Sequence, residues 1–117
     1  MPNNNQIFYV EFQADDLAAT KAFFIAAFGW KFTDYGPEYT SFEDGHMSGG
    51  FFKSEKRSTI AGGGPLVVLL NAQLEAALER VVASGGKITQ EIFSFPGGRR
   101  FHFIEPSGNE LAVCCLG

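Results

Sequence analysis

Three side chains in this sequence are suited to acid–base chemistry. His102 is one of two histidines and alternates with Phe101 and Phe103 in a strand-like run, so it points to the face opposite those rings. If the two phenylalanines pack on a helix, His102 faces the cavity as an acid or base. If they line the cavity, His102 is a hydrogen-bonded histidine on the other side. The alternatives for Glu11 and Glu110 are a general base beside the cavity, or a carboxylate near a sheet edge or dimer interface.

Two further basic groups have a spacing suited to anion binding. Arg99 and Arg100 follow Gly97-Gly98, and a guanidinium can hold a carboxylate or phosphate through two parallel hydrogen bonds. The alternative is a solvated start of a strand. His46 follows Gly45 in a predicted turn, and we expect it to face solvent.

Composition excludes several classes of function. The formal net charge is −4, the estimated pI is near 5.0, and the nine basic residues form no stripe, so nucleic acid is not an expected partner. No stretch approaches the roughly 18 apolar residues that a membrane span needs, and Met1 to Gln6 carries no targeting pattern. We therefore expect a cytoplasmic protein. Cys114 and Cys115 are adjacent in a predicted strand and are expected to be reduced thiols.

These residues are placed by a pattern that occurs twice. An extended apolar run from Ile7 to Gln13 precedes an amphipathic helix from Asp16 to Phe28, which Gly29 ends. The second copy has an apolar strand from Leu66 to Leu70 and a helix from Leu74 to Ala83, ended by Gly85-Gly86. Three strand-like runs follow each helix: 30–35, 39–43 and 48–53, then 87–95, 99–105 and 109–116.

Local signals predict the faces and ends of these elements. Asp15 or Asp16 can cap the first helix, and Asn71 is the cap candidate for the second. In the first strand, the set Phe8, Val10 and Phe12 is expected on the helix side. The apolar stripes of the two helices are predicted to be Leu17, Phe24 and Phe28, and Leu74, Leu78, Val81 and Val82.

Three stretches together resemble a known superfamily. They are Ala14-Asp15-Asp16-Leu17 leading to Phe28-Gly29-Trp30, Ser84-Gly85-Gly86-Lys87-Ile88, and Phe103-Ile104-Glu105-Pro106-Ser107-Gly108-Asn109. In this order and spacing they resemble the vicinal oxygen chelate superfamily, which contains glyoxalase I, extradiol dioxygenases, and fosfomycin- and bleomycin-resistance proteins.

The resemblance implies an α+β fold in a single domain over 1–117. Two βαβββ modules, about 6–53 and 65–116, are joined by a linker at about 54–64. They form a half-open, mostly antiparallel sheet with a concave ligand face, and the helices lie on the outer face. The resemblance also implies assembly across a dimer, and we expect a homodimer that buries on the order of 2,000 Å².

Catalytic members of that superfamily bind a divalent metal through His, Gln or Glu on particular strands. Aligned on the motifs above, those positions fall here on Tyr9, Leu66 and Ala112, with the fourth within 48–52, where Phe51 lies. None is an ordinary ligand for such a metal, so no metal and no cofactor is expected. With Arg100, these four are the predicted ligand-binding residues.

Two functions are consistent with these observations. The chain has 13 phenylalanines, more than a small core hides, so some aromatic rings are expected to line the cleft. The first hypothesis is therefore a metal-independent protein that binds a small aromatic or amphipathic organic molecule in a dimeric concave pocket. The second is a lyase or isomerase related to lactoylglutathione lyase, which uses Glu11, Glu110 or His102, or an atypical metal site.

Overall fold

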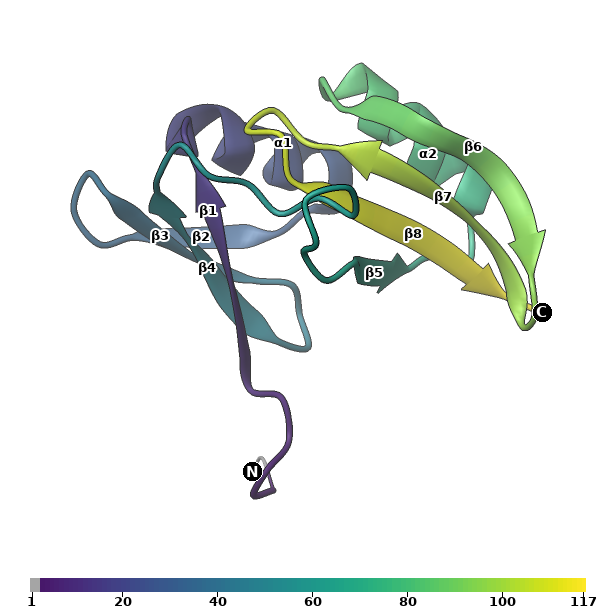
Figure 1. Ribbon diagram of the computed structural model, residues 1–117, viewed down its shortest axis with the longest axis horizontal. Coiled ribbons are helices and arrows are strands. Elements are labelled where there is room, and N and C mark those ends of the chain that lie inside the picture. Colours follow the sequence, from purple (N-terminus) through teal and green to yellow (C-terminus); the bar gives the residue numbers. More distant parts are fainter. Residues whose placement is uncertain (1–2) are drawn as a thin grey trace.

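The computed structural model describes residues 3–117 as two four-stranded sheets, each accompanied by one helix (Figure 1). Met1 and Pro2, at the start of the segment predicted to lack a targeting pattern, lie outside this range. The elements of the first half are β1 (Tyr9–Ala14), α1 (Leu17–Phe28), β2 (Lys31–Asp34), β3 (Tyr39–Glu43) and β4 (Ser48–Lys53). Those of the second half are β5 (Val67–Leu70), α2 (Leu74–Ala83), β6 (Lys87–Phe95), β7 (Gly98–Ile104) and β8 (Glu110–Leu116).

Each half is a βαβββ unit with the same strand order. The first sheet runs β1-β4-β3-β2 and the second β5-β8-β7-β6. In each sheet the first strand pairs in parallel with the last, and the other pairings are antiparallel. The fold is therefore α+β with two open, mixed sheets, as the repeated pattern and the resemblance predicted.

The helix boundaries follow from local chemistry, with one departure from the prediction. Asp16 caps α1, its side chain accepting a hydrogen bond from the Ala19 backbone N–H at 3.0 Å, and Gly29 ends the helix in the left-handed conformation. Asn71 does not cap α2. Its side chain accepts from the Gln73 N–H at 2.8 Å, which forms a turn before the helix begins at Leu74.

The predicted apolar faces also need correction at three positions. Val82 is 53% exposed, because the buried face of α2 passes through Ala77 and Val81 and turns Val82 outward. Phe8 is 67% exposed, because β1 begins only at Tyr9 and Phe8 lies outside the sheet. Leu66 lies directly before β5 and not within it.

One apolar core lies between the helices and the sheets. Phe12 and Phe51 from the first sheet, and Phe101 and Phe103 from the second, are buried together with Phe23 of α1. Since these rings define the helix side of each sheet, alternate residues of the same strands lie on the opposite side, which we term the open face.

A buried polar network fastens the two halves together. The Glu105 carboxylate, 2% exposed, accepts from the Thr20 hydroxyl of α1 at 2.6 Å and from the Asn109 side-chain amide at 2.7 Å. Asn109 also donates to the Gln13 carbonyl of β1 at 2.8 Å, and the Ser107 hydroxyl lies 2.7 Å from that of Thr20. The turn between β7 and β8 is therefore fixed against the first half, and this sets the relative position of the sheets.

Neither helix among the described residues is long and apolar enough to cross a membrane.

Candidate functional site

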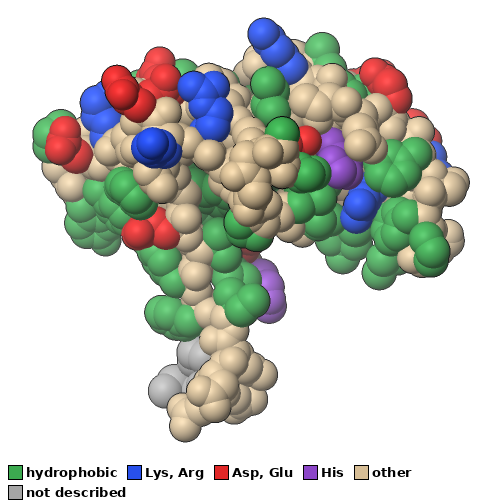
Figure 2. Space-filling model, viewed as in Figure 1, with side chains coloured by type: hydrophobic (Ala, Val, Ile, Leu, Met, Phe, Trp, Pro, Cys, Tyr) green, Lys and Arg blue, Asp and Glu red, His purple; other side chains and the backbone are tan. Residues whose placement is uncertain are grey.

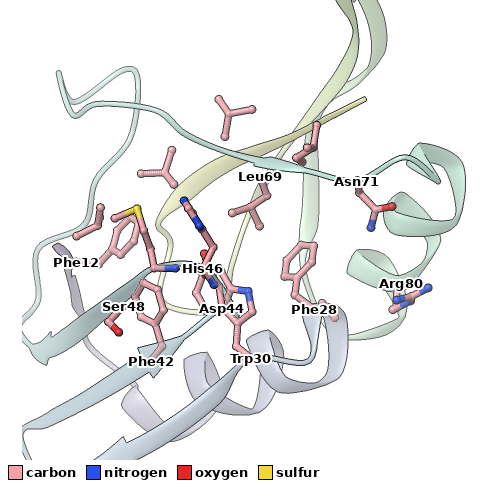
Figure 3. A pocket seen from close by; sticks show the side chains of 16 residues that line it. Phe12, Phe28, Trp30, Phe42, Asp44, His46, Ser48, Leu69, Asn71 and Arg80 are labelled. Atoms are coloured by element: carbon pink, nitrogen blue, oxygen red, sulfur yellow. Dashed lines mark hydrogen bonds between the residues drawn. The ribbon is translucent and has the colours of Figure 1, made fainter. Parts of the chain in front are cut away.

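A cavity of about 530 Å³ opens between the two halves, and we term it the inter-module groove (Figure 3). It lies on the helix side of the sheets, between the end of α1, the first sheet and β5. Its lining is mainly apolar, and the residues that form it are Val10, Phe12, Ala27, Phe28, Trp30, Phe42, Asp44, His46, Met47, Ser48, Val67, Val68, Leu69, Leu70, Asn71 and Arg80.

Stacked aromatic rings form one wall of the groove. Trp30 lies between Phe24 and Phe42, with ring centroids 4.4 Å apart on each side and interplanar angles of 12° and 19°. Gly29 places Trp30 there, because its left-handed conformation turns the chain back from α1 and lets the Trp30 N–H donate to the Phe24 carbonyl at 3.3 Å. In Figure 3, Phe28, Trp30 and Phe42 lie along one side and Leu69 of β5 lies across from them.

Polar side chains also line the groove. The Asp44 carboxylate accepts from the backbone N–H groups of His46 and Met47, both at 2.7 Å, which shapes the turn between β3 and β4. Asn71 and Arg80 lie at one end, close to α2 (Figure 3). The groove thus combines apolar walls with an acidic and a basic group, which suits an amphipathic molecule.

None of the eight site residues predicted from the sequence lines this groove. The eight are His102, Glu11, Glu110, Tyr9, Phe51, Leu66, Arg100 and Ala112. The structure instead distributes most of them over the open faces, so their roles stay predictions about a different surface.

On the open face of the first sheet, Tyr9 and Glu11 share a chain of hydrogen bonds. The Tyr39 hydroxyl donates to the Glu11 carboxylate at 2.9 Å and lies 2.5 Å from the Tyr9 hydroxyl. Because Tyr39 uses its only proton toward Glu11, Tyr9 is the donor in the shorter contact. Burial, followed by these hydrogen bonds, raises the pKa of Tyr39, so its phenol stays protonated.

Glycine makes room for these phenols. Gly50 pairs with Glu11 across the β1–β4 ladder, and a Cβ atom there would lie 2.0 Å from the Tyr39 hydroxyl oxygen and 2.8 Å from that of Tyr9. The neighbouring Gly49 makes room for the Phe42 ring on the helix side, where a Cβ atom would lie 2.3 Å from that ring. The two phenols therefore occupy the space beside β4, the strand on which the resemblance predicted a metal-ligand position.

On the open face of the second sheet, His102 is buried with no hydrogen bond. Its side chain is 4% exposed, and neither ring nitrogen has a partner among the described residues. Phe101 and Phe103 pack on the helix side, so His102 points to the open side, as the first alternative required, while its role as an acid or base stays a prediction. Burial, followed by the charge of Arg100, lowers the pKa of His102, which keeps the imidazole neutral at pH 7.

Glu110 and Ala112 lie beside His102 on β8. The Glu110 carboxylate is 3.9 Å from His102 Nδ1 and accepts from the Ile60 backbone N–H at 2.9 Å, so the connection between the halves holds it in place. Ala112 pairs directly with His102 across the β7–β8 ladder and is fully buried.

The remaining predicted residues differ in environment. Phe51 is fully buried on the helix side, stacked on Phe12 with centroids 5.2 Å apart, and has no surface on the open face. Leu66 is half-buried at the approach to β5. The Arg100 guanidinium lies over the rings of Phe93 and Phe95, 5.4 and 5.2 Å from their centroids.

The residues at the family's metal-ligand positions do not fit a divalent metal. Tyr9 offers a phenol that is already hydrogen-bonded to Tyr39. Leu66 offers only an aliphatic side chain, and Ala112 only a methyl group. Within residues 3–117, no three His, Cys, Asp or Glu side chains converge as a metal site requires. We therefore derive no chemistry through a metal.

Sequence reasoning did not identify the groove residues as a set. Phe28 was predicted only in the apolar stripe of the first helix, Trp30 was one of many aromatic rings of which some were expected to line a cleft, and His46 was expected to face solvent. The one available signal was the excess of aromatic residues, which predicts an aromatic cleft without showing which rings line it.

Comparison with known proteins gives a consistent classification. The model of the family described as Glyoxalase/Bleomycin resistance protein/Dioxygenase superfamily matches residues 6–113. A sequence search of curated proteins found no match.

Solved structures share the fold at low sequence identity. A glyoxalase-related enzyme from Fulvimarina pelagi superposes with a TM-score of 0.79 at 17% identity, covering 95% of this chain and 88% of that one. A glyoxalase/bleomycin resistance protein/dioxygenase family enzyme from Burkholderia phytofirmans PsJN superposes with a TM-score of 0.79 at 17% identity, covering 93% of this chain and 97% of that one. A third structure is a mutant of the fosfomycin resistance protein FosX from Listeria monocytogenes, complexed with Mn(II) and 1S,2S-dihydroxypropylphosphonic acid. It superposes with a TM-score of 0.77 at 14% identity, covering 94% of this chain and 89% of that one. At these identities the likeness concerns the fold.

Proposed function

The chain belongs to the glyoxalase/bleomycin resistance protein/dioxygenase superfamily, and from this premise we propose that it binds a small planar organic molecule in the inter-module groove. The observation that carries the proposal is the groove itself, whose volume of about 530 Å³ lies within the range of roughly 300–1,000 Å³ typical of small-molecule sites. Its aromatic wall is already stacked, so binding requires little ordering of side chains.

Binding in this groove requires no metal. The Phe28 ring and the edges of the Trp30 and Phe42 rings offer contact with an apolar body, while Asp44 and Arg80 are available for its polar groups. We further propose that the chain acts as a cytoplasmic homodimer. Exposed apolar side chains on the N-terminal segment and on β5, including Ile7, Phe8 and Leu70, support a partner subunit.

The sole tryptophan provides a direct assay. Trp30 is the only tryptophan of the chain and forms part of the wall, so a bound aromatic molecule should change its fluorescence. The probe is N-phenyl-1-naphthylamine, which is neutral and aromatic. We expect saturable quenching with a Kd in the micromolar range, about −8 kcal/mol. Removing divalent metals with EDTA should leave the Kd unchanged.

A matched pair of variants tests the location. Phe28→Leu removes a ring that lines the groove and should weaken binding about fivefold, from the loss of about 1 kcal/mol of aromatic contact. Phe32→Leu changes another half-buried ring, one that packs against Phe42 and Phe51 but does not line the groove, and should leave the Kd unchanged. Absence of saturable quenching in the unmodified protein, or equal effects of both substitutions, would contradict the proposal.

A second candidate function is a lyase or isomerase activity that uses Glu11, Glu110 or His102. The observation in its favour is a neutral imidazole 3.9 Å from a carboxylate, which is a possible acid–base pair. Conversion of the methylglyoxal–glutathione hemithioacetal to lactoylglutathione, lost in His102→Gln, would support this candidate. No conversion with or without added Ni²⁺ or Zn²⁺ would remove it.

A further inference from the structure

The tryptophan of the inter-module groove has an unused hydrogen-bond donor. Phe24 and Phe42 cover the two faces of the Trp30 ring, so the ring reaches the groove with its edge (Figure 3). Trp30 is 6% exposed, and among the described residues its indole N–H has no acceptor, since its hydrogen bond is made by the backbone N–H. The described side-chain atoms that are both fully buried and unbonded belong to Arg100 and His102, so the indole nitrogen retains some exposed surface. A buried tryptophan normally donates this proton, so the groove provides a donor for a ligand.

The strand register places Asp44 opposite this tryptophan. β2 and β3 are antiparallel, and their ladder begins with Lys31 opposite Glu43. One further step in the same register sets Trp30 opposite Asp44, and alternation puts Asp44 on the side of Phe42. All three side chains line the groove. Because opposite residues of an antiparallel pair have Cβ atoms about 5 Å apart, the indole N–H and the Asp44 carboxylate belong to the same part of the groove.

One oxygen of the Asp44 carboxylate is free to accept from a ligand. Oδ1 accepts from the backbone N–H groups of His46 and Met47, while Oδ2 has no hydrogen-bond partner among the described residues. Within the same part of the chain, no cationic side chain lies within ion-pair distance of Asp44. An unpaired carboxylate repels an anion, so a carboxylate or phosphate group of a ligand is disfavoured at this place. A donor and an acceptor side by side instead suit a neutral group that accepts one hydrogen bond and donates another.

We propose that the groove selects planar aromatic molecules that carry a phenolic hydroxyl, an inference that rests on the proposed function. The hydroxyl oxygen accepts from Trp30 Nε1–H and donates its proton to Asp44 Oδ2, and we term this place the hydroxyl site. A phenol has a pKa of about 10 and therefore keeps its proton at pH 7. The aromatic body lies along Phe28 toward β5. On the face drawn in Figure 2, hydrophobic side chains gather along the lower border, where Figure 1 places β5, and most charged side chains lie along the upper border.

Three probes with one ring system separate the two hydrogen bonds. 2-Naphthol accepts and donates, 2-methoxynaphthalene only accepts, and 2-methylnaphthalene does neither. Trp30 is the only tryptophan, so the NMR spectrum of the protein contains one indole N–H signal, which reports each titration. We expect the two oxygen-bearing probes to shift the indole proton downfield, as a new hydrogen bond does, and 2-methylnaphthalene to bind without that shift.

The affinities test the contribution of Asp44. We expect 2-naphthol to bind about fivefold more tightly than 2-methoxynaphthalene, because it alone donates to the carboxylate. Asp44→Asn should abolish this preference, since the amide oxygen still accepts from the turn while an NH₂ group replaces the free oxygen. Glu43→Gln is the matched control, because it removes a neighbouring carboxylate that does not line the groove, and the preference should remain. Unfolding curves establish that both variants are folded.

The outcomes separate the hydroxyl site from the proposed function. Equal affinities for 2-naphthol and 2-methoxynaphthalene, or a preference that survives Asp44→Asn, overturn the hydroxyl site. An indole proton that does not move downfield with 2-naphthol overturns it as well. Binding of 2-methylnaphthalene that weakens in Phe28→Leu supports the proposed function in each of these cases. If none of the three probes changes the indole signal or quenches Trp30 fluorescence, both proposals fail.

Discussion

Replacing Thr20 by valine tests the contact that joins α1 to the turn between β7 and β8. The Thr20 hydroxyl is fully buried and donates to the Glu105 carboxylate at 2.6 Å. Valine has nearly the same shape but cannot donate. A hydrogen bond to a charged group contributes about 1.5–3 kcal/mol. Glu105 keeps its donors from Ser107 and Asn109, so we expect the free energy of unfolding to fall by about 2 kcal/mol.

Urea unfolding followed by Trp30 fluorescence measures this loss. The midpoint should fall while the m-value stays constant, because the surface exposed on unfolding does not change. For a chain of this length the same loss lowers Tm by about 8 °C. All variants are compared at one protomer concentration, because association with a second copy would add to the apparent stability.

Thr33→Val is the matched control. Thr33 lies exposed on β2, and its replacement should change the free energy of unfolding by less than about 0.5 kcal/mol. If Thr20→Val also costs less than about 0.5 kcal/mol, the network does not fasten the halves. In Glu105→Gln, adding Thr20→Val should cost less than it does alone, because the neutral amide oxygen accepts a weaker hydrogen bond from Thr20 than the carboxylate does. Additive losses would refute the pairing.

Two further predictions concern His102 and the paired glycines of β4. Burial holds the pKa of folded His102 below its ordinary value of 6.5, so the unfolded state binds more protons than the folded state just below pH 6.5, and the free energy of unfolding should fall as the pH is lowered, by at most about 1.4 kcal/mol per pH unit. His102→Gln should flatten this slope in urea titrations between pH 6.5 and 5, and an unchanged slope would contradict the assignment. Gly49→Ala should destabilise the fold by about 3 kcal/mol, because the new methyl group meets the Val10 carbonyl and the buried Phe42 ring, whereas Gly50→Ala should cost about 1 kcal/mol, because its methyl group meets phenols that can partly move. Thermal melts that give the reverse order would show that the phenol cluster is rigid.

The fold could be predicted from the sequence because its signals are local and repeated. Asp16 and Gly29 bound α1 where the pattern indicated, and the strand runs after each helix match β2 to β4 and β6 to β8 within one or two residues. Errors occurred where one residue type serves several roles. Asn71 stabilises a turn as readily as it caps a helix, and only the chain direction after Gln73 decides between them.

The groove could not be predicted because its residues are far apart in the sequence. Trp30 and Leu69 lie across the cavity from each other, although each is an ordinary apolar residue in its own segment (Figure 3). The hydrogen-bond network at Glu105 also joins residues that are far apart in the sequence. The motif Glu105-Pro106-Ser107-Gly108-Asn109 was recognised, but its partner Thr20 lies on a helix whose predicted buried stripe did not include it. Long-range packing determines both features.

The repeated architecture does not carry a repeated chemistry. Both sheets have the same strand order, yet the open face of the first carries the Glu11 carboxylate with two phenols, and that of the second carries Arg100 and a neutral His102. In the first sheet every named polar group has a hydrogen-bond partner within the chain, and Gly50 preserves the space for it. In the second, Arg100 and His102 do not. Because unbonded buried groups cost free energy, the second face carries a free-energy cost that the first face does not.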